Sequence, residues 1–204
     1  MTLVKICGLT NLDDALAAVD AGADALGFNF YPRSPRYISP ANAREITDHL
    51  PSSVLRVGVF VNEELQSLSR VVSEASLTAV QLHGDETPEY CDQLKATFVI
   101  KVFGAGDDLD LRAYNVNAIM LDTKDKLLYG GTGRVFDWSI AQRANNSVPK
   151  LFLAGGLSPE NVAEAIATVR PYAVDACSSL ETTPGKKNHE RVRAFINAVR
   201  QSEP

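Results

Sequence analysis

Short runs of apolar residues recur along the chain, and between them apolar positions repeat every three or four residues. The runs are nearly continuous and rich in β-branched and aromatic residues, which is typical of strands covered on both faces, as in a parallel sheet. They lie at residues 2–7, 23–30, 55–61, 78–82, 98–103, 117–122, 150–155 and 173–177. The pattern therefore predicts eight parallel strands.

Amphipathic helices are predicted between most of these strands. The first opens at Asn11 and places apolar residues on one face, namely Leu12, Ala15, Leu16 and Val19. Ser39-Pro40 and Ser158-Pro159 each predict a helix start, because serine caps a helix and proline fits its first turn. The segment after the fifth strand, residues 104–108, leaves room for only a short fifth helix.

Eight strand–helix units without a tandem repeat or a linker predict a single (β/α)8 TIM barrel. We expect it to be a closed parallel barrel that spans residues 1–204 as one domain. The length of 204 residues, 45% of them hydrophobic, suits one domain of this type. A doubly wound open sheet is the alternative that the pattern alone leaves open.

Composition narrows the class of protein. A formal net charge of −5 argues against a nucleic-acid binder, which would carry a basic face. The chain has no apolar run of about eighteen residues, so we expect no membrane span, and residues 1–8 read as a strand rather than a signal peptide. The three cysteines are far apart, so we expect no disulfide framework, no zinc site and a cytoplasmic location.

Polar residues and glycines gather where the predicted strands end, which is where barrel enzymes place their active sites. In chain order the candidates are Cys7, Arg36, Gln81, His83, Asp122, Gly155, Gly156, Asp175, Ser178 and Ser179. The predicted barrel brings all of them to one face.

Gly155-Gly156 and Ser178-Ser179 together predict a phosphate site. Glycine lets the backbone approach an anion, and exposed N–H groups at a helix start donate hydrogen bonds to it. Either pair alone fits an ordinary turn. Both pairs together, after the seventh and eighth strands, match the position where barrels bind phosphate.

Cys7 and Asp122 are the candidates for proton transfer. A thiolate at Cys7 can act as a base if the site lowers its pKa, whereas an unpaired cysteine without context is more often a small buried residue. Asp122 closes an apolar run, so its carboxylate needs a partner or a polar cavity. Asp175 lies in a similar run, so this argument does not single out Asp122.

Two other residues, His83 and Arg36, each have a functional and a structural interpretation, and a third, Cys91, has only a structural one. His83 either stacks on a substrate or, as we favour, hydrogen-bonds a neighbouring loop. Arg36 either neutralises a carboxylate through a bidentate fork or is an ordinary solvated arginine. Cys91 falls in the pattern of the fourth helix and is expected to be structural.

The ordered set of motifs resembles the phosphoribosylanthranilate isomerase family of tryptophan biosynthesis over essentially the whole chain. The matching stretches are KICGLT at 5–10, GADALGF at 22–28, SPRYI at 34–38, VGVFVN at 57–62, VQLHG at 80–84, LD at 121–122, GGTG at 130–133, FDW at 136–138, AGGLSPENV at 154–162, VD at 174–175 with Glu181, and PGKK at 184–187.

The resemblance implies an Amadori rearrangement of N-(5-phosphoribosyl)anthranilate into 1-(2-carboxyphenylamino)-1-deoxyribulose 5-phosphate. Cys7 matches the family's general base, Asp122 its general acid and Arg36 a residue that contacts the anthranilate portion. The other predicted substrate contacts are Gln81, His83, Asp175 and the phosphate-binding residues Gly155, Gly156, Ser178 and Ser179. The substrate's own nitrogen serves as the electron sink, so we expect no metal and no cofactor.

One stretch departs from the family pattern. Where the family usually has serine-serine-glycine, this chain has Cys177-Ser178-Ser179. Main-chain contacts to phosphate would tolerate the change. It nevertheless raises the questions of a side-chain role for Cys177 and of the backbone conformation at Ser179.

The alternatives are another phosphosugar barrel enzyme (an epimerase, a decarboxylase or an indole-forming synthase) and a non-catalytic phosphosugar-binding barrel. A metal-dependent epimerase needs several ligands at strand ends, which three histidines do not supply. An indole-forming synthase is expected to carry catalytic lysines and more chain before the first strand. The expected partner is a small phosphosugar, and a monomer and a homodimer both remain open.

Overall fold

The computed structural model describes residues 1–94, 97–106, 110–123, 137–148 and 150–202. Eight parallel strands form a closed barrel in chain order, with β1 paired to β8. They are β1 (Leu3–Ile6), β2 (Ala25–Asn29), β3 (Leu55–Phe60), β4 (Ala79–Leu82), β5 (Phe98–Gly104), β6 (Ala118–Asp122), β7 (Leu151–Leu153) and β8 (Ala173–Ala176). Closure excludes the open doubly wound sheet, so the predicted TIM barrel is confirmed.

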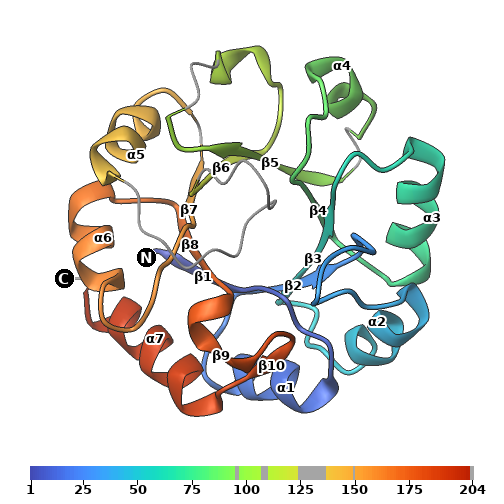
Figure 1. The fold of residues 1–204 in the computed structure, drawn as a ribbon, viewed down its shortest axis with the longest axis horizontal. Coiled ribbons are helices and arrows are strands. Elements are labelled where there is room, and N and C mark those ends of the chain that lie inside the picture. Colours follow the sequence, from blue (N-terminus) through green and yellow to red (C-terminus); the bar gives the residue numbers. More distant parts are fainter. Residues whose placement is uncertain (95–96, 107–109, 124–136, 149, 203–204) are drawn as a thin grey trace.

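Helices surround the ring of strands (Figure 1). They are α1 (Leu12–Asp20), α2 (Pro40–Thr47), α3 (Leu65–Glu74), α4 (Pro88–Cys91), α5 (Trp138–Asn145), α6 (Val162–Val169) and α7 (His189–Gln201), with short 3-10 turns η1 (Asp92–Leu94), η2 (Leu111–Ala113) and η3 (Ser178–Leu180). The three-residue η2 follows β5, where only a short helix was expected. Among the described residues, no helix is long and apolar enough to cross a membrane.

Two of the three predicted helix starts are confirmed. The side chains of Asn11 and Ser39 accept hydrogen bonds from the first turns of α1 and α2. The start predicted at Ser158-Pro159 is wrong, because α6 begins at Val162. Asn161 ties the preceding turn together: its side chain donates to the Gly156 carbonyl at 3.0 Å and accepts from the Ser158 N–H at 2.8 Å.

The core has two layers because side chains alternate between the two faces of each strand. Those outside the ring pack under the helices, and a second apolar cluster fills the barrel. Its members include Val57, Ile100, Met120 and Phe152. Polar side chains are also buried in the barrel strands, namely Lys5, Gln81, Lys101 and Asp175. The interior is therefore not uniformly apolar.

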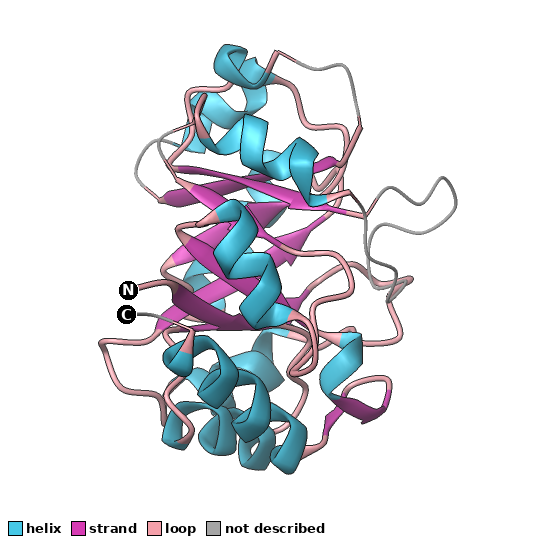
Figure 2. Cartoon of the chain, turned by 90° about the vertical axis from the view of Figure 1, so that its left-hand side faces the viewer, coloured by secondary structure: helices cyan, strands magenta, loops and turns pink. Residues whose placement is uncertain are grey.

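A small antiparallel hairpin of β9 (Glu181–Thr183) and β10 (Lys186–Lys187) follows η3 and was not predicted. It lies beside α1, where the Thr10 hydroxyl donates to the Gly185 carbonyl at 2.6 Å. Figure 2 shows the N-terminus at one end of the barrel and this hairpin at the other. The hairpin therefore sits at the end where the strands finish.

Candidate active site

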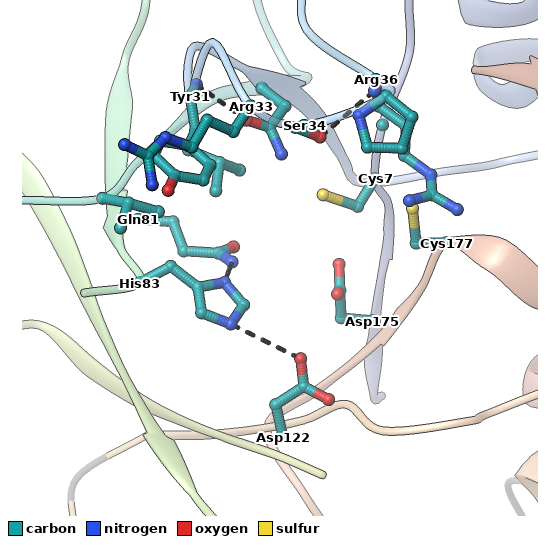
Figure 3. Close-up of a pocket in the computed structure, with 15 residues that line it drawn as sticks. Cys7, Tyr31, Arg33, Ser34, Arg36, Gln81, His83, Asp122, Asp175 and Cys177 are labelled. Atoms are coloured by element: carbon teal, nitrogen blue, oxygen red, sulfur yellow. Dashed lines mark hydrogen bonds and ion pairs between the residues drawn. The ribbon is translucent and has the colours of Figure 1, made fainter. Parts of the chain in front are cut away.

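The carboxyl ends of the strands surround a cavity of about 120 Å³ (Figure 3). Six of the predicted site residues line it, namely Cys7, Arg36, Gln81, His83, Asp122 and Asp175. A smaller hollow of about 30 Å³ is lined by the other four, Gly155, Gly156, Ser178 and Ser179. Asp122, Asp175 and Cys177 line both spaces. The structure therefore brings all ten predicted residues together in two adjoining hollows.

Cys7 follows the last residue of β1, and its N–H donates to the Ala176 carbonyl at 3.0 Å. Its sulfur occupies the space that a side chain at Gly27 would fill, since a Cβ there would lie 2.7 Å from Sγ. A hydrogen bond from Cys177 and the nearby charge of Lys5 outweigh burial and lower the pKa of Cys7 to about 6. Near neutral pH the thiolate therefore predominates.

Lys5 is a residue of the site that the sequence analysis missed. It is fully buried, and its Nζ lies 2.6 Å from Asp175 Oδ1. Burial lowers the pKa of Lys5, but Asp175 and the Cys7 thiolate together raise it above its ordinary value, so the ammonium stays charged. Its position two residues before Cys7 was the available signal, because alternate residues of a strand share a face.

Asp122 ends β6 with a side chain only 14% exposed. Desolvation, reinforced by the charges of Asp175 and Cys7, raises the pKa of Asp122 to about 7, although the Thr123 N–H donates to Oδ1 at 2.7 Å. A carboxyl group with this pKa holds a proton in about half of the molecules at neutral pH. The predicted polar surroundings of this carboxyl group are therefore present.

His83 and Gln81 form a pair at the end of β4. Gln81 Nε2 lies 3.1 Å from His83 Nδ1, and His83 Nε2 lies 3.7 Å from Asp122 Oδ2. Desolvation and the charges of Lys5 and Lys101 lower the pKa of His83 to about 3, so the ring is neutral. The expected hydrogen bond from His83 to a neighbouring loop is wrong, because its ring pairs with Gln81 on β4, the strand that His83 directly follows.

Arg36 is not an ordinary solvated arginine, since its side chain is only 13% exposed. Its Nε and Nη2 donate to the two oxygens of Glu181 at 2.9 and 2.7 Å. Lys187, also buried, lies 2.9 Å from Glu181 Oε1. The fork to a carboxylate is therefore made inside the protein, and it holds the guanidinium against the cavity wall.

The smaller hollow has the features of an anion site. Gly155 and Gly156 have φ of +85° and +68°, a conformation that favours glycine. Within the described part of the chain, no acceptor is found for their N–H groups. Ser178 and Ser179 begin η3, whose first hydrogen bond runs from the Leu180 N–H to the Cys177 carbonyl, so their N–H groups precede it.

The departure from the family pattern has a structural explanation at residue 179. Ser179 does not have the positive φ that favours glycine. Its hydroxyl donates to the Leu157 carbonyl and thereby joins η3 to the loop after β7. Cys177 lines the cavity with Cys7, and its sulfur lies 3.9 Å from Glu181 Oε1 and 3.9 Å from Lys187 Nζ. The replacement at 177 thus places a second thiol in the cavity.

Two expectations remain without a test at this site. The GGTG stretch at 130–133 lies outside the described residues. In the part of the chain that the structure describes, no cluster of three or more His, Cys, Asp or Glu side chains is placed to hold a metal ion. That the reaction needs no metal stays a prediction.

A thiol and a carboxyl group that face one cavity at the carboxyl ends of a closed (β/α)8 barrel define the class as a barrel enzyme of acid–base chemistry. The family model described as N-(5'phosphoribosyl)anthranilate (PRA) isomerase matches residues 4–198. The chain belongs to this family. The predicted resemblance, the fold and the enzyme class, an isomerase of tryptophan biosynthesis, are thereby confirmed.

Individual relatives agree over the full length. The chain is 50% identical over 204 residues to the N-(5'-phosphoribosyl)anthranilate isomerase of Thermotoga neapolitana, covering 98% of this chain and 99% of the relative. The crystal structure of phosphoribosyl anthranilate isomerase from Thermotoga maritima superposes with a TM-score of 0.91 at 47% identity, covering 98% and 100%. A phosphoribosyl anthranilate isomerase structure with reduced 1-(o-carboxyphenylamino)-1-deoxyribulose 5-phosphate gives 0.88 at 46% identity, with the same coverage.

Proposed function

We propose that the chain converts N-(5-phosphoribosyl)anthranilate into 1-(2-carboxyphenylamino)-1-deoxyribulose 5-phosphate, with Asp122 as general acid and Cys7 as general base. The observation that carries the assignment of roles is the pairing of these two groups on one cavity, with pKa values of about 7 and about 6. At neutral pH the carboxyl group can still donate a proton while the thiolate can accept one.

Asp122 starts the reaction by protonating the ring oxygen of the ribose. The C1–O bond then breaks, and the anilino nitrogen lone pair forms an iminium at C1. The Asp122 carboxylate left after this proton transfer lies close to the neutral His83, whose Nε2 is 3.7 Å from Asp122 Oδ2. The Thr123 N–H at 2.7 Å from Oδ1 supports the carboxylate that forms when the proton leaves.

Cys7 completes the reaction by removing the proton at C2, which the adjacent iminium makes acidic. The electron pair of that C–H bond moves toward nitrogen and gives an enamine, which tautomerises to the ketone. The buried ammonium of Lys5 favours the thiolate before this step. No electron acceptor beyond the substrate is required by this scheme.

The phosphate is assigned to the smaller hollow, where the N–H groups of Gly155, Gly156, Ser178 and Ser179 would donate to it. Backbone donors at the start of a turn suit an anion because they carry partial positive charge without a net charge. The shared lining of the two hollows by Asp122 and Asp175 supports one ligand that reaches from the phosphate to the reacting carbons.

Three further side chains are assigned to the remainder of the substrate. Arg36 would hold the anthranilate carboxylate, since Glu181 takes only two of the five guanidinium N–H groups. Gln81 Oε1 is buried and lacks a hydrogen-bond partner in the described residues, which suits a substrate hydroxyl. Asp175 holds Lys5 through Oδ1, leaving Oδ2 as a second acceptor.

We also propose a cytoplasmic location, which the three free cysteines support. The oligomeric state, monomer or homodimer, stays a prediction.

The decisive experiment is an assay of purified protein with N-(5-phosphoribosyl)anthranilate, following anthranilate fluorescence, with and without prior EDTA treatment. Turnover that survives EDTA is expected. Binding without turnover would indicate a phosphosugar-binding barrel instead. Activity lost to EDTA and restored by zinc or magnesium would contradict the acid–base scheme.

A further inference from the structure

Cys7 and Cys177 end neighbouring strands of the barrel. The last register pair of β1 and β8 is Ile6 with Ala176, and the two cysteines follow it directly. The Cys7 N–H donates to the Ala176 carbonyl at 3.0 Å, so the strands are still together at this level. Paired strands lie about 4.8 Å apart, and disulfides join Cα atoms about 4.4–6.8 Å apart. The backbone therefore brings the two residues within reach of a disulfide.

The two side chains also share one space. Both line the large cavity, and Figure 3 shows the Cys7 sulfur pointing into it and the Cys177 sulfur beside Arg36. A side chain at Gly8 would lie 2.8 Å from the Cys177 sulfur, so the glycine leaves room for it. Because both residues line this cavity, a small oxidant that enters it can reach both thiols.

The electrostatics give the two thiols different roles. The neighbouring Cys177 thiol lowers the pKa of Cys7 to about 6, whereas Cys7 and burial raise that of Cys177, whose sulfur donates to Glu181 Oε1 at 3.9 Å. The thiolate attacks peroxides far faster than the thiol does. Lys187 Nζ, 3.9 Å from the Cys177 sulfur, favours that thiolate in the later step. Cys91 differs, because burial in α4 raises its pKa to about 11.

We propose that hydrogen peroxide converts Cys7 and Cys177 into a reversible disulfide that switches the enzyme off. In the first step the Cys7 thiolate attacks one peroxide oxygen, an S–O bond forms, the O–O bond breaks and hydroxide leaves. In the second step Cys177 attacks the Cys7 sulfenic sulfur, an S–S bond forms and the S–O bond breaks. The Cys177 proton goes to the departing hydroxide, so one thiolate, one thiol and one peroxide give a disulfide, one water and one hydroxide.

The disulfide would remove the proton acceptor at Cys7, and a dithiol reductant would restore it. Cys177 also protects Cys7, because a sulfenic acid that finds no second thiol is oxidised further and irreversibly. Only the loss of activity rests on the proposed function, since the disulfide itself needs just the two thiols.

The test treats the native protein with hydrogen peroxide, then measures free thiols under denaturing conditions, mass, linked peptides and activity. We expect one free thiol to remain of the three, a mass lower by about 2 Da and a peptide that joins Cys7 to Cys177. Activity should fall and return to at least half of its starting value with dithiothreitol, as judged against an untreated sample.

Two serine variants complete the test, each compared with its own untreated activity. Cys91→Ser should behave like the wild type. Cys177→Ser should lose activity to peroxide without recovery, and gain oxygen at Cys7. Absence of the linked peptide, or full recovery of Cys177→Ser, would overturn the proposal. A linked protein that stays active would support the disulfide and overturn the base role of Cys7 and the switch.

Discussion

Lys5 and Asp175 form a buried ion pair across the paired strands β1 and β8, with Nζ 2.6 Å from Oδ1. Each charge acts on the proton-transfer pair. The Lys5 ammonium lowers the pKa of Cys7, while the Asp175 carboxylate raises those of both Cys7 and Asp122. The Lys5–Asp175 ion pair therefore favours the Cys7 thiolate while the Asp122 carboxyl group keeps its proton.

The first prediction is a bell-shaped dependence of kcat/KM on pH. Cys7 must be deprotonated, so activity should rise as the pH passes about 6. Asp122 must be protonated, so activity should fall as the pH passes about 7. Because the substrate phosphate also titrates, the rate of Cys7 alkylation against pH provides an independent measure of the lower limb. Activity that rises steadily to pH 9 would contradict the assignment of the acid.

The second prediction concerns Asp175→Asn. Loss of this carboxylate should lower the pKa of both Cys7 and Asp122, so both limbs of the bell should move to lower pH. The variant leaves the Lys5 charge unpaired and should lose about 3–5 kcal/mol of stability, so it is assayed at low temperature. The position of the bell is the readout, because KM changes for other reasons. If neither limb of the pH profile moved, Asp175 would not affect the pKa values of Cys7 and Asp122.

The third prediction tests the phosphate site through Gly156→Val. A side chain at φ +68° would strain the backbone and close the hollow. We expect KM for substrate to rise at least about ten-fold, which is about 1.4 kcal/mol, and inhibition by inorganic phosphate to weaken. Gly106→Val is the matched control, since Gly106 has φ +96° with open space around it. An unchanged KM in Gly156→Val would place the phosphate elsewhere.

The fourth prediction concerns stability. Asp14 is buried on α1 and accepts hydrogen bonds from the Lys187 N–H at 2.7 Å, Asn11 at 2.8 Å and His189 at 2.7 Å. Asp14→Asn has one acceptor oxygen in place of two, so its free energy of unfolding at pH 7 should fall by about 1–3 kcal/mol. Asp13→Asn, on the exposed side of the same helix, should cost less than about 0.5 kcal/mol.

The pH dependence of this difference gives a second check. Burial raises the pKa of Asp14, but the hydrogen bonds from Lys187, Asn11 and His189 outweigh it, so the pKa is lowered on folding. A lowered pKa contributes stability above the unfolded value of about 3.9, and that stability is lost as the pH falls through the folded value. Urea titrations at pH 7 and pH 3 should show the gap shrink; an equal gap would contradict the account.

The fold could be predicted because each strand–helix unit has its own local signals. Eight buried strands alternate with helices, several of which begin at a capping side chain, and only closure remained to be decided. The start of α6 was misjudged because Asn161 binds the Gly156 carbonyl with its side chain and holds residues 158–161 in a turn. A serine followed by proline is the same local signal in either arrangement.

The positions of the site residues could be predicted better than the ion pairs and hydrogen bonds between them. Cys7 and Asp122 were placed at strand ends from the sequence, whereas the ion pair of Lys5 with Asp175 joins residues 170 positions apart. Such a pair depends on the register between β1 and β8, which short apolar runs do not reveal. For the same reason the hydrogen bonds from Arg36 to Glu181 could not be predicted from the sequence.

The last prediction divides the labour between Cys7 and Asp122. Cys7→Ser substitutes an alcohol that is almost never ionised at neutral pH, and Asp122→Asn keeps the acceptor for the Thr123 N–H but has no carboxyl proton to give. Each should lower kcat by about 10²–10⁴-fold. Both changes are nearly isosteric, so thermal melting and binding of a product analogue should show folded protein with the phosphate loops intact.

Deuterium at C2 of the substrate separates the two roles. In Cys7→Ser the removal of that proton becomes fully rate-limiting, so the isotope effect on kcat should exceed that of the wild type. In Asp122→Asn ring opening becomes the slow step and C2 is not yet involved, so the effect should be close to one. Near-wild-type turnover by either folded variant would remove that residue from the mechanism. A large isotope effect in Asp122→Asn would mean that Asp122 acts after ring opening, not before it.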